Sequence, residues 1–75
     1  MNEIEQTWTA YRAKVVQWDA SSVQVSETRR AYYAGAGAIV RMLLAGDVPG
    51  SVARDLELFR LEVERFRADV AAGRA

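Results

Sequence analysis

Cysteine and histidine are both absent from this sequence, and proline occurs once. Without cysteine the chain has no disulfide, no thiolate metal ligand and no sulfur nucleophile. Without histidine, a transition-metal site lacks its usual nitrogen ligand, and the commonest general base near neutral pH is missing. No catalytic triad, phosphate-binding glycine loop or convincing pair of carboxylates replaces them. We therefore expect a protein that is not an enzyme, with no metal and no cofactor.

Long hydrophobic runs and an excess of one charge are also absent. The longest uncharged run, Ala31 to Val40, is about half of a membrane span. The first residues are acidic and polar, unlike those of a signal peptide. Ten basic and ten acidic residues give a net charge of zero, which disfavours nucleic-acid binding. We expect a soluble, cytoplasmic protein with no membrane partner.

Apolar residues recur at helical spacing along the chain, and no useful stretch alternates as a strand does. Breaks near residues 19–22 and 46–51 divide the pattern into helices at about 3–18, 22–45 and 50–72. Their short connections predict a single all-α domain, a three-helix up-down-up unit. Asn2 and Glu5 have the spacing of a capping box for the first helix. Its large aromatics Trp8, Tyr11 and Trp18 are expected in the core, and the third helix carries a regular seam of Val52, Leu56, Phe59, Val63, Phe66 and Val70.

The central helix is unusually rich in small residues. A glycine inside a helix costs about 1 kcal/mol relative to alanine, so Gly35 and Gly37 indicate the close approach of another helix. On a helical wheel, one side carries the residues that we assign to the intramolecular core: Val25, Thr28, Tyr32, Gly35, Ala36, Ile39, Met42 and Leu43.

The opposite side of the central helix is also small or apolar and requires a partner from outside the chain. A chain of 75 residues without a disulfide or metal often gains stability by self-association. We therefore predict a homo-oligomer, dimeric or higher, formed through the central helix. The expected interface residues are Ala34, Gly35, Ala38, Leu44, Leu58 and Leu61.

Cations cluster on the same helix, where Arg29, Arg30 and Arg41 face a single acid, Glu27. Guanidinium groups make bidentate contacts with carboxylates and phosphates. We predict a site for a phosphorylated or nucleotide-like small molecule at Arg29, Arg30, Tyr33, Gly37 and Arg41. The alternative is that the arginines pair only with acids of the protein and that the small residues only let helices touch.

The stretch from Gln24 to Ala36 fits the pattern Q-x-x-E-x-R-R-A-[FY]-[FY]-A-G-A, and residues 71–75 read A-A-G-R-A. In these features the chain resembles a group of small uncharacterised helical proteins of bacteriophages and prophages. The resemblance implies a phage origin, and because the group carries no catalytic assignment, it assigns no functional residue to this chain. Small phage proteins of this size often act against host defences, by blocking a protein complex or by sequestering a nucleotide immune signal.

Three functions are compatible with these features. The first is a homo-oligomeric binding protein that sequesters a nucleotide-derived or phosphorylated small molecule and acts in phage counter-defence. The second is a helical inhibitor or adaptor that binds a host protein through Leu58, Leu61 or exposed aromatics, with no small ligand. The third is a structural or regulatory phage component.

Overall fold

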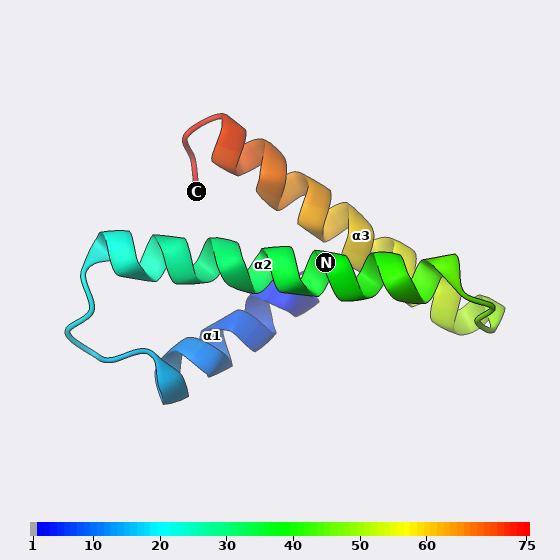
Figure 1. The fold of residues 1–75 in the computed structure, drawn as a ribbon, viewed down its shortest axis with the longest axis horizontal. Coiled ribbons are helices and arrows are strands. Elements are labelled where there is room, and N and C mark those ends of the chain that lie inside the picture. The colour runs from blue at the N-terminus through cyan, green and yellow to red at the C-terminus, as the bar shows by residue number, and fades with distance from the viewer. Residues whose placement is uncertain (1) are drawn as a thin grey trace.

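A computed structural model describes residues 2–75, which form three α-helices and no strand. These are α1 (Glu3–Val15), α2 (Ser22–Ala45) and α3 (Gly50–Ala71). Successive helices reverse direction, with α2 in the middle, and α3 diverges from α2 as it leaves the hairpin that joins them (Figure 1). The all-α prediction with three helices is confirmed, and the bounds predicted for the second and third helices agree within one residue.

The first helix is shorter than its apolar stripe predicts. It ends at Val15, and Val16 has an extended backbone, with φ of −81° and ψ of 131°. Adjacent β-branched residues are weak helix formers, and Val15 at this end of α1 is 59% exposed, so little packing supports a further turn. Trp18 lies in the turn beyond it and is 97% exposed. The prediction that Trp18 is a core anchor is therefore wrong, and Tyr11 is exposed as well, whereas Trp8 is buried, with its ring centroid 5.6 Å from that of Tyr32.

The N-terminus of α1 is capped from another helix. The Asn2 side chain makes no capping hydrogen bond. Instead, the buried Glu62 carboxylate of α3 accepts hydrogen bonds from the backbone N–H groups of Ile4, at 3.0 Å, and Glu5, at 2.9 Å. A carboxylate at this position satisfies free N–H groups and interacts favourably with the helix dipole. The predicted Asn2 and Glu5 capping box is wrong because a tertiary contact occupies its place.

The other helix ends are formed by local sequence. Ser21 and Gln24 make a reciprocal capping box at the start of α2, with hydrogen bonds of 3.1 and 2.9 Å. At the end of α3, Gly73 adopts a φ of +76°, and the Arg74 N–H reaches the Asp69 carbonyl oxygen at 2.7 Å. This is the arrangement in which glycine closes a helix at low steric cost. It turns residues 73–75 back towards α2 (Figure 1).

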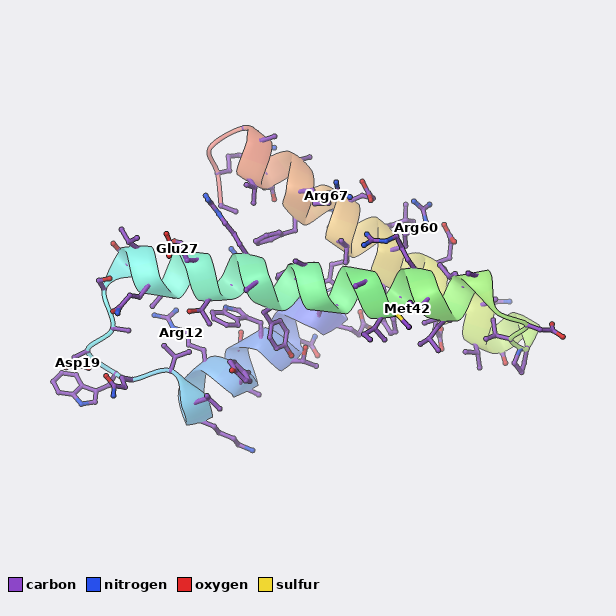
Figure 2. The ribbon with its side chains drawn as sticks, in the orientation of Figure 1. Arg12, Asp19, Glu27, Met42, Arg60 and Arg67 are labelled. Atoms are coloured by element: carbon purple, nitrogen blue, oxygen red, sulfur yellow. The ribbon has the colours of Figure 1, made fainter. Side chains whose placement is uncertain are left out.

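The buried side of α2 differs from the predicted one. Tyr33, Gly37 and Val40 are buried towards α3, and a Cβ on Gly37 would lie only 3.1 Å from Val63 Cγ1. Close approach at this glycine is therefore to α3 of the same chain. On the side assigned to the core, Gly35, Ile39, Met42 and Leu43 are exposed. The reason is that α1 lies against the N-terminal half of α2 and leaves the other half uncovered (Figures 1 and 2).

Among residues 2–75, no helix has both the length and the apolar character needed to cross a bilayer.

Candidate functional site

A cleft of about 480 Å³ opens where α2 and α3 diverge. Five residues of its lining come from α2 and five from α3, so the angle between the two helices sets its width. The lining consists of Arg30, Tyr33, Ala34, Gly37, Arg41, Val63, Phe66, Arg67, Val70 and Ala71. Its volume falls within the range typical of small-molecule sites.

The lining combines an apolar floor with three arginines and contains no acid. Arg30 and Arg41 come from α2, and Arg67 comes from α3, where Figure 2 labels it. Beside the cleft, Glu64 lies 3.5 Å from Arg67, with both side chains exposed. An exposed ion pair of this length contributes little, so the cleft presents a predominantly positive surface to a ligand.

Arg30 already holds an oxygen atom. Its Nη2 donates a hydrogen bond of 2.6 Å to a backbone oxygen of Ala75, the last residue of the sequence. The turn at Gly73 brings this oxygen to the guanidinium group. The contact shows that an oxygen acceptor can reach Arg30 in this geometry.

The Arg41 side chain lies beside Gly37 of α2, which has no side chain of its own. Its Nη1 is 3.7 Å from the position that a Cβ on Gly37 would take. Glycine at this position thus admits both the Val63 side chain of α3 and the Arg41 guanidinium. A larger residue would push one or both of them away.

Two stacked rings form the inner wall of the cleft. The Tyr33 and Phe66 rings are nearly parallel, with centroids 3.9 Å apart. The Tyr33 hydroxyl donates to Glu5 Oε2 at 2.7 Å and lies 3.2 Å from Glu62 Oε2. Burial, reinforced by these two carboxylates, raises the pKa of Tyr33 above its usual value. The ring of Tyr33 thus lines the cleft, while its hydroxyl group belongs to a hydrogen-bonded network with Glu5 and Glu62. We call this set of contacts the network.

Arg29 belongs to that same network. Its Nη2 donates to Glu5 Oε2 at 2.7 Å, and its guanidinium carbon lies 4.8 Å from the Phe66 ring centroid. Burial alone would raise the pKa of Glu5, but hydrogen bonds from Tyr33 and Arg29 outweigh it and lower that pKa. Glu5 raises the pKa of Arg29 despite the opposing effect of burial. Each partner thus stabilises the charged form of the other.

The structure brings together Arg30, Tyr33, Gly37 and Arg41, four of the five residues predicted to bind a ligand. Arg29 is not among the lining residues, because Glu5 and the Phe66 ring hold it on another side of α2. Sequence reasoning missed Arg67 and the apolar contribution of α3. The available signal was that Arg60 and Arg67 follow one edge of the third-helix seam. Only the packing of α3 on α2 reveals that Arg67 faces the cleft.

The residues predicted to form an oligomer interface are dispersed over the structure. Ala34 lines the cleft, Gly35 and Leu61 are exposed, and Ala38, Leu44 and Leu58 are half-buried. They therefore do not form a single surface. Gly35 and Ala38 share one side of α2, whereas Leu58 and Leu61 are on α3.

No family model, curated protein or solved structure matches this chain. In the described part of the chain, no three acidic side chains gather as metal ligands would. The cleft itself is suited to binding an anion, because guanidinium groups supply paired N–H donors and a charge that acids of the lining do not cancel.

Proposed function

We propose that this protein binds a small phosphorylated molecule, of the nucleotide class, in the cleft between α2 and α3, and does not transform it chemically. The observation that carries the proposal is the set of three arginines on an otherwise apolar lining without acids.

The two parts of the lining match the two parts of such a ligand. The planar guanidinium forks of Arg30, Arg41 and Arg67 suit phosphate oxygens. The apolar floor, with the ring of Phe66 among its residues, suits a nucleobase or another flat apolar group. A ligand oxygen at Arg30 would replace the backbone oxygen of Ala75.

The biological role that we propose is sequestration, in a homo-oligomeric phage protein that removes a nucleotide signal of a host defence system. The resemblance of residues 24–36 to small phage proteins supports the origin, and the cleft supports the ligand class. Protein inhibition without a small ligand is the alternative outcome of the experiment below.

The test is calorimetric titration with a cyclic dinucleotide, ADP-ribose, AMP and inorganic phosphate, next to thermal unfolding with the same compounds. We expect binding of at least one nucleotide, with a rise in Tm that follows ligand concentration. The double variant Arg30→Ala with Arg41→Ala should weaken that binding by about a hundredfold, about tenfold for each lost phosphate contact.

The matched control is Arg54→Ala with Arg65→Ala, which removes two exposed arginines of α3 outside the cleft. It changes the net charge by the same amount, so it should reproduce any general electrostatic effect and leave ligand affinity within about threefold. Equal weakening by both double variants would show that the cleft is not the site. Silence across the whole panel would reject the small-ligand function.

A further inference from the structure

The C-terminal half of α2 has a large apolar surface that the chain does not cover. Ile39, Met42 and Leu43 are 55%, 70% and 46% exposed and lie within about one helical turn of one another, in the C-terminal half of α2. In Figure 2, Met42 lies on the part of α2 beyond α1. Towards the start of the helix the same side has the exposed small residues Ala31 and Gly35. We call these five residues, with Ala38 between them, the open face of α2.

The total surface of the chain is too large for a compact monomer. A compact protein of 8.3 kDa exposes about 4,600 Å², whereas this chain exposes 5422 Å². The excess, about 800 Å², is close to what each partner buries in a standard protein interface. The molecule is also only 19 Å thick along its shortest axis, about two layers of helix. The chain therefore has enough uncovered surface for one partner of ordinary size.

We infer that a second copy of this chain covers the open face, with the two α2 helices antiparallel around a two-fold axis. In this arrangement a bulky half of one helix meets a small half of the other. Met42 of one copy lies opposite Ala31 of the second, and Ile39 lies opposite Gly35. Both pairs place the two-fold axis at about the level of residue 37. A Cβ on Gly35 would contact nothing within 4 Å in the single chain, so there is open space for the Ile39 side chain of the second copy.

The pairing is self-complementary, which favours a second copy over an unrelated partner. Each contact occurs twice in a two-fold dimer, so a single stripe of about 16 Å supplies both halves of the interface. No charged residue belongs to the open face, because Arg41 lies towards the cleft. The cleft is on the α3 side of α2, so dimerisation leaves both clefts accessible. This inference rests on the self-association named in the proposed function and specifies the surface responsible.

The first test measures mass by sedimentation equilibrium from micromolar to millimolar concentration. We expect a dimer, and the double variant Ile39→Glu with Met42→Glu should raise its dissociation constant at least a hundredfold. Both side chains are exposed in the single chain, so helicity should be retained. Leu61→Glu, at an exposed leucine on α3, is the control and should leave the dimer intact.

A second variant, Gly35→Leu, should give a monomer with undiminished helix content, because leucine favours a helix but fills the open space beside Gly35.

The absence of native cysteine allows a direct test of direction. In an antiparallel dimer Ala38→Cys lies near the two-fold axis and should form an interchain disulfide, whereas the two copies of Ala31→Cys are separated by about 18 Å along the axis and should not. Efficient cross-linking at both positions would overturn the antiparallel arrangement. A dimer that survives Ile39→Glu with Met42→Glu would reject this face alone, whereas a wild-type monomer at all concentrations would reject self-association itself.

Discussion

Arg29 and Arg30 are adjacent in sequence but lie in opposite electrostatic surroundings. Arg29 is half-buried, paired with Glu5, and placed over the Phe66 ring. Arg30 is exposed and donates a hydrogen bond to an oxygen of Ala75, the last residue of the sequence, with no Asp or Glu side chain as its partner among residues 2–75. A rotation of 100° between neighbouring helix positions is enough to send one guanidinium into a structural network and the other to an acid-free cleft.

The two regions share a wall, the Tyr33 and Phe66 ring pair. On one side, two carboxylates and the Arg29 guanidinium converge near the Tyr33 hydroxyl. On the other side the same rings line a cleft with three arginines. The network uses its charges to attach α1 to α2 and α3, whereas the arginines of the cleft make only exposed contacts, Arg30 with an oxygen of Ala75 and Arg67 with Glu64.

The largest effect should come from removing the acid that anchors the network. Glu62→Ala leaves the N–H groups of Ile4 and Glu5 without their acceptor. We expect a loss of about 1–3 kcal/mol in the free energy of unfolding, measured by urea denaturation. Because Trp8 is buried in α1, its fluorescence should report release of that helix. Glu57→Ala, at an exposed acid of the same helix, should cost less than about 1 kcal/mol. Equal losses in the two variants would show that the cap is not important.

The next prediction compares the two neighbouring arginines directly. Arg29→Ala removes a half-buried hydrogen bond to Glu5 and a cation–π contact with Phe66, so it should cost about 1–2 kcal/mol. Arg30→Ala removes one exposed hydrogen bond and should cost less than about 0.5 kcal/mol. Ligand affinity should show the reverse order. A variant pair in which Arg30→Ala is the more destabilising would contradict the division between network and cleft.

Much of this fold follows from local sequence rules. The bounds of α2 could be predicted because the Ser21 and Gln24 cap and the break after Ala45 are formed by adjacent residues. Most of the seam of α3 could be predicted because its spacing is regular: Leu56, Val63 and Phe66 are indeed buried, although Val52 at its start is exposed. The end of α1 could not, because an apolar stripe does not show whether a partner helix is present to cover Val15 and Trp18.

The candidate site was predictable in composition but not in arrangement. Arg30, Gly37 and Arg41 share one side of an ideal helix, which the sequence alone shows. The side of α2 that meets α3 depends on how the helices pack, so Tyr32 and Ala36 of the predicted core side do pack against the core, whereas Gly37 of the opposite side is buried. The roles of Glu62 and Arg67 depend on contacts between residues far apart in sequence, which spacing does not reveal.

The smallest expected effect is a pH dependence that only the network should show. Its contacts lower the pKa of Glu5 below the ordinary value of 4.5. A lowered pKa means that the ionised form favours the folded state, so this contribution is present above about pH 4.5 and is lost as the pH falls through the folded-state pKa. Because the ion pair is partly exposed, we expect it to amount to less than about 1 kcal/mol. Urea denaturation of Glu5→Gln and wild type between pH 3 and 7 isolates this contribution from that of the other acids. The two stabilities should converge towards low pH, and a difference that stays constant over the range would mean that ionisation of Glu5 does not stabilise the fold.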